Sequence, residues 1–254
     1  MAGVKLRVGG VTDMSTVDWY GNVSLVVFFA GCNFRCPYCQ NSGLIPLDSG
    51  REVPLDLLRE RIKANQSILD AVVFTGGEPL IQIESVIAAA KLSKKLGLKV
   101  MLDTNGSDKD AVTKALQSGF IDRIALDVKA PLDIYDYGNV TGRPDLAPKS
   151  VEAVETCLNL TSNLGLEMEA RTTVAPGLSD ASDFIARIAK SLKGRVDVYY
   201  LQQFDNAGEI LSQNLKLEKP PSREKMMALA KVAVEEGLQN VFIKTRSDGL
   251  ERMS

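Results

Sequence analysis

Short apolar runs alternate with longer amphipathic segments along most of this chain. Seven runs have the length and composition of strands: 25–29, 71–74, 99–102, 123–128, 167–174, 196–201 and 240–244. Six segments between them show the apolar spacing of helices: 54–64, 83–96, 108–117, 149–164, 181–192 and 222–236. Strands that alternate with helices in this way are typical of a parallel sheet covered by helices.

The pattern therefore predicts an α/β fold. Six strand–helix units and a last strand favour a partial (β/α)6 barrel similar to a TIM barrel, and a doubly wound sheet is the alternative. No linker rich in Pro, Gly or Ser divides the chain, so we expect a single domain over residues 1–254. Both folds place their functional site at the carboxyl ends of the strands.

Composition narrows the class of protein. The chain is 45% hydrophobic, enough for a sizeable core, and its formal net charge of -2 predicts no binding to nucleic acid. The longest apolar run, Leu25 to Ala30, is far shorter than the roughly 20 residues that span a bilayer. Residues 1–10 do not resemble a signal peptide. We expect a cytoplasmic protein that does not bind a membrane.

Three cysteines follow the first apolar run in one short loop. Cys32, Cys36 and Cys39 have the spacing C-x3-C-x2-C, which gathers three thiolates on one side of a tight turn. No fourth ligand is nearby in the sequence. The spacing suits a metal centre that is left open at one position.

Zinc and iron–sulfur clusters compete for this loop. Structural zinc takes four protein ligands, but the chain has no histidine, and Cys157 lies in a segment with the pattern of an amphipathic helix. Iron–sulfur clusters are held by cysteine thiolates, and a cubane with three protein ligands leaves one iron free. The spacing favours an iron–sulfur cluster. A zinc site, or cysteines with a structural role only, are the alternatives.

With Tyr38 in the aromatic position, the loop resembles the C-x3-C-x-aromatic-C signature of the radical S-adenosylmethionine (SAM) enzymes. The resemblance implies a [4Fe-4S] cluster on Cys32, Cys36 and Cys39, with its free iron chelated by the amino and carboxylate groups of SAM. Reductive cleavage of SAM then yields methionine and a 5′-deoxyadenosyl radical, which abstracts hydrogen from the substrate. We expect no protein side chain to act as a catalytic acid or base.

Gly76-Gly77-Glu78 directly follows the run 71–74. By itself, the motif is explained by a tight turn from strand to helix. Downstream of the cysteine loop it resembles the Gly-Gly-Glu motif of the radical SAM family. That resemblance implies that its carbonyls and carboxylate bind the SAM ammonium group.

Two later strands end in Asp103-Thr104 and in Asp127-Val128-Lys129. Asp127 and Lys129 are two residues apart, so their side chains share one face of the strand. If the SAM carboxylate lies beside Asp103 and Asp127 in a partly dry site, the repulsion between these negative charges must be offset by a cation. Lys129 and a bound monovalent ion would supply that positive charge. Without the cysteine loop, an Asx turn and a local ion pair would explain these residues.

The order of these motifs resembles the activating enzymes of glycyl-radical enzymes, namely the pyruvate formate-lyase and anaerobic ribonucleotide reductase activases. The resemblance covers residues 17–245. It implies a cation and SAM-carboxylate site at Asp103, Thr104, Asp127 and Lys129. Together with the earlier motifs and two residues on later strands, the expected cofactor-binding residues are Tyr38, Gly76, Gly77, Glu78, Asp103, Thr104, Asp127, Lys129, Arg171 and Gln202.

Two of these assignments have open alternatives. Arg171 contacts the SAM methionyl group or the substrate, or it forms an ion pair with Glu169 or with a helix carboxylate. Gln202 is expected to replace a ribose-contacting histidine of the pyruvate formate-lyase activases, because Phe204 occupies the place of that histidine. The aromatic segment 18–21 covers the cluster or packs in the core.

The leading hypothesis is that the chain installs a glycyl radical on a partner such as an anaerobic ribonucleotide reductase. Cys157 alone cannot ligate a second cluster, so electrons are expected from a flavodoxin or a ferredoxin. One alternative is a radical SAM enzyme that acts on a small metabolite or a modified nucleoside. Another is a non-catalytic iron–sulfur or zinc protein.

Overall fold

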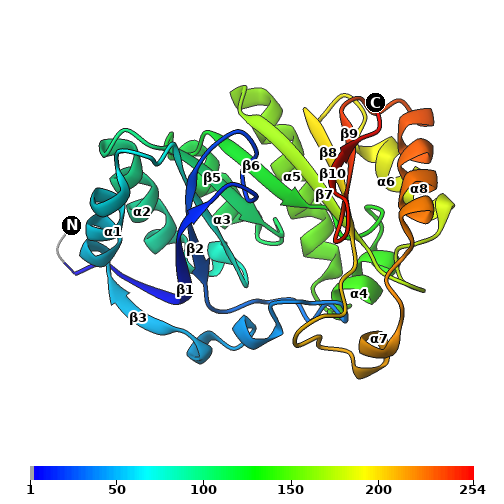
Figure 1. Cartoon of the computed structure of the whole chain (residues 1–254), viewed down its shortest axis with the longest axis horizontal. Helices are drawn as coiled ribbons and strands as arrows, with labels where there is room; N and C mark the ends of the chain where they lie inside the picture. Colours follow the sequence, from blue (N-terminus) through cyan, green and yellow to red (C-terminus); the bar gives the residue numbers. More distant parts are fainter. Residues whose placement is uncertain (1–2) are drawn as a thin grey trace. The chain divides into compact units, whose positions relative to one another are not determined.

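The computed structural model describes residues 3–254, which form two compact units. The first unit contains the chain up to Asn33, then Gly43–Thr104 and Asp110–Ala125. The second contains Phe34–Ser42, Asn105–Lys109 and Leu126–Ser254. Strands and helices alternate in both units, as Figure 1 shows. The predicted α/β class is confirmed, and the prediction of a single domain stays a prediction.

The first unit is built on five strands. These are β1 (Lys5–Ser15), β2 (Ser24–Phe29), β3 (Arg51–Pro54), β4 (Ala71–Gly76) and β5 (Lys99–Thr104), in the spatial order β5-β4-β2-β1-β3. Strands β2, β4 and β5 are parallel, and β1 is antiparallel to both β2 and β3. The parallel strands therefore all end at one edge, where the expected site motifs begin.

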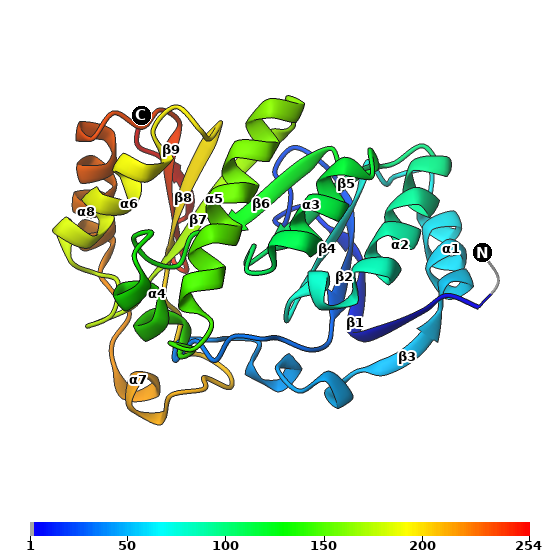
Figure 2. The same ribbon diagram turned by 180° about the vertical axis from the view of Figure 1, so that it is seen from behind.

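Helices α1 (Leu55–Asn65), α2 (Ile83–Lys95) and α3 (Lys109–Gln117) complete the first unit, in which α1 packs against α2 (Figure 2). Three short 3-10 turns join its elements: Ser42–Leu44, Leu47–Ser49 and Pro79–Gln82. The buried face of α2 carries Val86, Ala89 and Ala90, a spacing of three and four residues that puts these side chains on one stripe. The helices predicted over 54–64, 83–96 and 108–117 differ from these bounds by at most one residue at either end.

The second unit contains β7 (Glu167–Val174), β8 (Val198–Gln203), β9 (Val241–Thr245) and β10 (Gly249–Arg252), in the order β10-β9-β8-β7. Strands β7, β8 and β9 are parallel, whereas β10 is antiparallel to β9. Its helices are α4 (Ile134–Thr141), α5 (Ala147–Leu164), α6 (Ser182–Leu192), α7 (Gln213–Leu217) and α8 (Arg223–Glu235). Strand β6 (Arg123–Asp127) has its first three residues in the first unit and its last two in the second.

The sequence analysis missed three strands and two helices. Strands β1, β3 and β10 are the antiparallel ones, and they lack the continuous apolar composition of strands that are buried on both faces. Within β1, Gly9 and Gly10 interrupt the pattern. Helices α4 and α7 span eight and five residues, too short for a clear helical period. Among residues 3–254, no helix is long and apolar enough to cross a membrane.

Trp19 lies in the core of the first unit. Its side chain is 5% exposed and packs with Val26, Val73 and Met101, so the core interpretation of the aromatic segment is confirmed. The charged groups of Lys99 and Arg123 each lie 5.9 Å from its ring, within the range of a cation–π contact.

Replacing Trp19 by Ala should therefore lower the free energy of unfolding by about 3–5 kcal/mol, the cost of emptying a large aromatic site in a core. Urea denaturation followed by circular dichroism measures this change. Tyr20→Ala is the matched control, because the neighbouring Tyr20 is 37% exposed and should cost much less. Equal losses in the two variants would contradict the core role of Trp19.

Candidate functional site

The Gly-Gly-Glu loop is attached to the end of β2 by backbone hydrogen bonds. Gly77 N donates to Phe29 O at 2.8 Å, and Glu78 N donates to Gly31 O at 2.7 Å. A Cβ atom at Gly76 would lie 2.4 Å from the backbone of Phe29, and one at Gly77 would lie 2.2 Å from Gly31 O. Both glycines are thus required by the close approach of two backbones, a reason that the sequence analysis did not foresee.

The carboxylate of Glu78 is held inside the first unit. Its Oε1 atom accepts hydrogen bonds from the Thr104 hydroxyl at 2.7 Å and from Leu80 N at 3.0 Å. Glu78 and Thr104 are only 2% and 3% exposed. The carboxylate is therefore buried in a fixed orientation, as a binding group for a cation requires.

Asp103 lies on the same strand as Thr104 and is positioned by a neighbour. The Thr75 hydroxyl donates to Asp103 Oδ2 at 2.8 Å, which joins the end of β4 to the end of β5. Thr75 was not predicted as a site residue. Its position directly before Gly-Gly-Glu is the signal that could have indicated it.

The second unit contains the other part of the cysteine loop. Cys39 N donates to Cys36 O at 3.0 Å, which closes the tight turn that the spacing predicted. Arg35 N donates to Thr141 O at 2.8 Å, so the last residue of α4 holds the loop just before Cys36. Cys36 is buried, while Cys32 and Cys39 are partly exposed, and none of these three forms a disulfide.

Lys129 is a mostly buried cation of the second unit. Its Nζ atom lies 2.9 Å from Asp127 Oδ2 and 6.0 Å from the centre of the Tyr38 ring, and its side chain is 13% exposed. Burial alone would lower the pKa of Lys129, but the charge and the hydrogen bond of Asp127 raise that pKa well above its usual value. Lys129 is therefore protonated at neutral pH.

The pKa values of the Cys36 and Cys39 thiols depend on the same surroundings. Burial raises the pKa of Cys36 to about 11, and Lys129 opposes that rise. Burial also raises the pKa of Cys39. Without a bound group these thiols stay protonated at neutral pH, so metal binding must release their protons. A cation beside the loop favours that release.

Val128 holds Asp127 and Lys129 in place. Its amide donates to Arg171 O at 2.9 Å, and its carbonyl accepts from the Thr172 hydroxyl at 2.7 Å. The buried Tyr199 hydroxyl donates in turn to Thr172 Oγ1 at 2.9 Å. Strands β7 and β8 thus fix the direction of the side chains on either side of Val128.

Arg171 and Gln202 take different positions. Arg171 Nε donates to the Glu169 carboxylate, and the two side chains are 13% and 5% exposed, so the ion pair considered as one alternative is present. Gln202 is partly exposed near the end of β8, whereas Phe204 is fully buried. The side chain of Phe204 has no polar group that could contact a ribose, and the role of Gln202 stays a prediction.

The residues fit an open cluster better than a closed zinc site. An open cubane takes one thiolate on each of three iron atoms and leaves the fourth free, whereas a closed zinc site needs four ligands around one ion. Among residues 3–254, no three His, Cys, Asp or Glu side chains are grouped as ligands of a single ion. The buried Tyr38 hydroxyl also has no hydrogen-bond partner among these residues, so this polar group of the loop is available to a bound cofactor.

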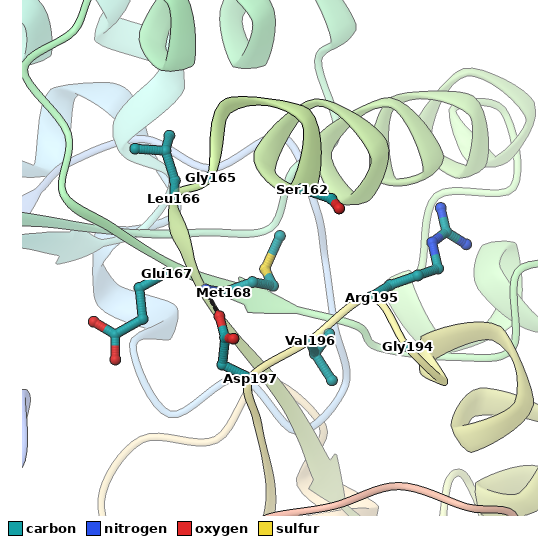
Figure 3. A pocket seen from close by; sticks show the side chains of 9 residues that line it. All are labelled: Ser162, Gly165, Leu166, Glu167, Met168, Gly194, Arg195, Val196 and Asp197. Atoms are coloured by element: carbon teal, nitrogen blue, oxygen red, sulfur yellow. Dashed lines mark hydrogen bonds between the residues drawn. The ribbon is translucent and has the colours of Figure 1, made fainter.

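A pocket of about 420 Å³ lies elsewhere in the second unit, at the amino ends of its strands. It is lined by Leu166 to Met168 at the start of β7 and by Gly194 to Asp197 before β8 (Figure 3). Arg195 is bound to Glu155 and Asn159, and Asp197 accepts from Met168 N at 2.7 Å. Its polar groups thus serve the fold, and none is a predicted site residue.

Comparison with known proteins agrees with this chemistry. The sequence profile of the radical SAM superfamily matches residues 26–189. The chain belongs to the radical SAM superfamily. It is similar to a putative glycyl-radical enzyme activating enzyme of Methanocaldococcus jannaschii, with 33% identity over 95% of this chain and 97% of that protein. The pyruvate formate-lyase 1-activating enzyme of Escherichia coli is 27% identical over 93% of this chain and 98% of its own length.

Solved structures show the same fold. A radical SAM methyltransferase from Sphaerobacter thermophilus superposes with a TM-score of 0.71 at 15% identity, over 89% of this chain and 67% of that one. QueE from Escherichia coli superposes with a TM-score of 0.57 at 13% identity, over 95% of each chain. The predicted partial-barrel fold of the radical SAM enzymes is confirmed. Membership of the superfamily implies a [4Fe-4S] cluster and SAM as cofactors.

Cys36→Ala should abolish iron loading, because three thiolates are the minimum set for an open cubane. Cys157→Ala is the matched control, because Cys157 is a buried thiol on α5 and is not an expected ligand. This variant should load iron as the unaltered protein does. Iron and sulfide analysis after anaerobic reconstitution measures both. Full iron loading of Cys36→Ala would overturn the ligand assignment.

Proposed function

We propose that this radical SAM chain activates a glycyl-radical enzyme by abstracting a hydrogen atom from a backbone glycine of that partner. The observation that carries the proposal is the similarity to activating enzymes over nearly the full length of both proteins. We propose an anaerobic ribonucleotide reductase as the partner and a pyruvate formate-lyase as the alternative. A flavodoxin or a ferredoxin is proposed as the electron donor.

In the proposed mechanism, Cys32, Cys36 and Cys39 would hold the cluster. When bound and reduced, the cluster would supply one electron for the cleavage of SAM to methionine and a 5′-deoxyadenosyl radical. Transfer of a hydrogen atom from the partner's glycine would give 5′-deoxyadenosine and a glycyl radical. Because the atoms and the electron balance without a proton transfer, no side chain of this chain need act as an acid or base.

The chain's own residues bind and orient SAM. Glu78 and the carbonyls of Gly76 and Gly77 are proposed to accept hydrogen bonds from the SAM ammonium group. The buried carboxylate of Glu78 suits this role, because a cation that leaves water needs such acceptors. Tyr38, Arg171 and Gln202 are proposed to complete the cofactor site.

A second set of residues is proposed to bind the SAM carboxylate. Lys129 supplies a positive charge, and its ion pair with Asp127 keeps that charge in the site. We also propose a monovalent cation between Asp103, Thr104 and Asp127. It would offset the repulsion between these carboxylates and the carboxylate of SAM.

Lys129→Met should weaken SAM binding by about tenfold, the effect of losing roughly 1.4 kcal/mol of charge interaction, while the iron stays in place. Calorimetric titration of the reconstituted protein measures the affinity. Lys91→Met is the matched control, because Lys91 also lies over an aromatic ring, at 5.7 Å from Phe120, but is not a site residue. Unchanged SAM affinity in Lys129→Met would refute the assignment.

Incubation of the reduced protein with SAM and each candidate partner tests the function. We expect a glycyl-radical doublet in the paramagnetic resonance spectrum of the partner, together with 5′-deoxyadenosine. A partner whose radical-bearing glycine is replaced by alanine should give no doublet. Production of 5′-deoxyadenosine with no doublet on either partner would sink the proposal and favour a small-molecule substrate.

A further inference from the structure

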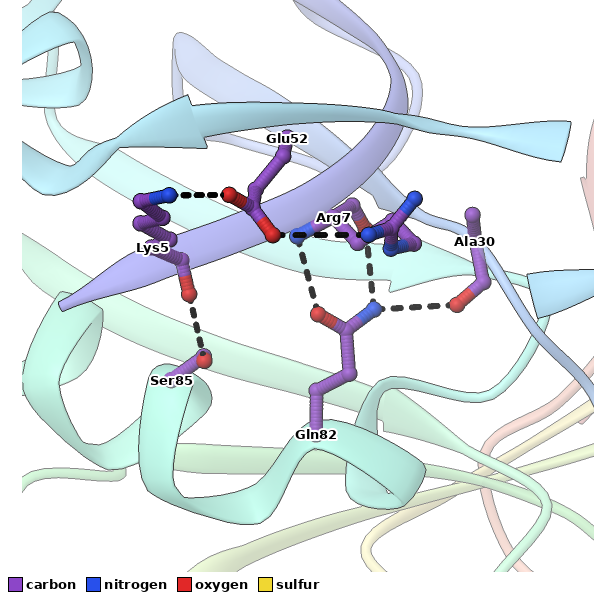
Figure 4. A network of polar contacts seen from close by, with 6 residues as sticks. All are labelled: Lys5, Arg7, Ala30, Glu52, Gln82 and Ser85. Carbon is purple, nitrogen blue, oxygen red and sulfur yellow. Dashed lines mark hydrogen bonds and ion pairs between the residues drawn. The ribbon is translucent and has the colours of Figure 1, made fainter. Parts of the chain in front are cut away.

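Gln82 connects three segments of the first unit through its side-chain amide. Its Oε1 atom accepts from Arg7 N at 2.9 Å, and its Nε2 atom donates to Arg7 O at 2.8 Å and to Ala30 O at 2.9 Å. Figure 4 shows the amide lying between β1 and the end of β2. One side chain thus hydrogen-bonds to backbone atoms of β1 and of the residue that follows β2.

The position of this amide is set by the Gly-Gly-Glu loop. Gln82 is the last residue of the 3-10 turn Pro79–Gln82, in which the Glu78 side chain accepts from Leu80 N. Gln82 also precedes α2, but its side chain makes no capping hydrogen bond to that helix. Its hydrogen-bonding capacity is used on β1 and β2.

Ala30 is where β2 leaves its partner strand. The pairing of β2 with β4 ends at Phe29 and Gly76, so Ala30 O lies beyond the last pair of that ladder. Ala30 is fully buried, and a buried carbonyl needs a donor. Gln82 supplies that donor two residues before Cys32, and Glu78 N supplies the next one to Gly31 O.

We propose that Gln82 is a positioning residue of the SAM site, which holds the chain entering the cysteine loop in register with the Gly-Gly-Glu loop. The inference rests on the assignment of Cys32 and Glu78 to the cluster and SAM sites, and not on the identity of the partner enzyme. Loss of the amide leaves the cysteines available as ligands but frees the backbone that orients Cys32 relative to Glu78. SAM binding should therefore suffer more than iron binding.

Two variants of Gln82 test this role. Gln82→Met keeps the length of the side chain without its hydrogen bonds. Gln82→Glu keeps an acceptor for Arg7 N but, as a carboxylate, cannot donate to Arg7 O or Ala30 O. Ser85→Ala is the matched control, because the Ser85 hydroxyl also ties α2 to β1, donating to Lys5 O at 2.8 Å, but does not contact β2.

We expect both Gln82 variants to retain their iron and to bind SAM about tenfold more weakly, the usual effect of removing a group that orients a ligand. The change that SAM induces in the paramagnetic resonance spectrum of the reduced cluster should shrink at a fixed SAM concentration. Ser85→Ala should resemble the unaltered protein in both measurements. Neither measurement needs a partner enzyme, so failure of the proposed activation would not affect them.

Hydrogen exchange of the cluster-free protein gives an independent measurement. The amides of Ala30, Gly31 and Cys32 are hydrogen-bonded, and they should exchange faster in the Gln82 variants than in Ser85→Ala. SAM affinity within twofold of the unaltered protein in both Gln82 variants would overturn the inference. Loss of iron from both, or an equal loss of SAM affinity in Ser85→Ala, would also overturn it.

Discussion

The contact between the end of β2 and the Gly-Gly-Glu loop is the constraint on which the site residues of the first unit depend. Two backbone hydrogen bonds, from Gly77 and Glu78, join the loop to the chain that continues into Cys32. The contact is possible only because positions 76 and 77 carry no side chain. A motif expected to serve a ligand therefore also serves the fold, and Cys32 and the Glu78 carboxylate are positioned together.

Charge burial organises the site residues of the second unit. Lys129 forms an ion pair with Asp127, which favours its protonated form, and lies over the ring of Tyr38. An isolated ammonium group would be costly at this depth, so the Asp127 carboxylate and the aromatic ring make its burial possible. The same charge opposes the burial that raises the pKa of the Cys36 thiol. One lysine thereby links the strand that carries Asp127 to the loop that carries the cysteines.

Much of this architecture could be predicted because buried parallel strands leave a strong pattern. The seven predicted strands and six predicted helices are present, with ends that differ by a few residues. Strands β1, β3 and β10 were missed because antiparallel strands at the margins are not continuously apolar. The site residues could be proposed from the sequence for a related reason. Parallel strands end at one edge of a sheet, so polar residues directly after such strands are expected to lie near one another.

The sequence by itself determined the cysteine spacing, the absence of histidine and the order of the strand-end motifs, because these are properties of the chain alone. Only the tertiary structure placed Trp19 in the core and revealed the ion pair between Arg171 and Glu169. It also revealed Gln82, whose amide meets backbone atoms 75 and 52 positions away. Such partners leave no local pattern, because a side chain that binds backbone carbonyls imposes no residue type on them.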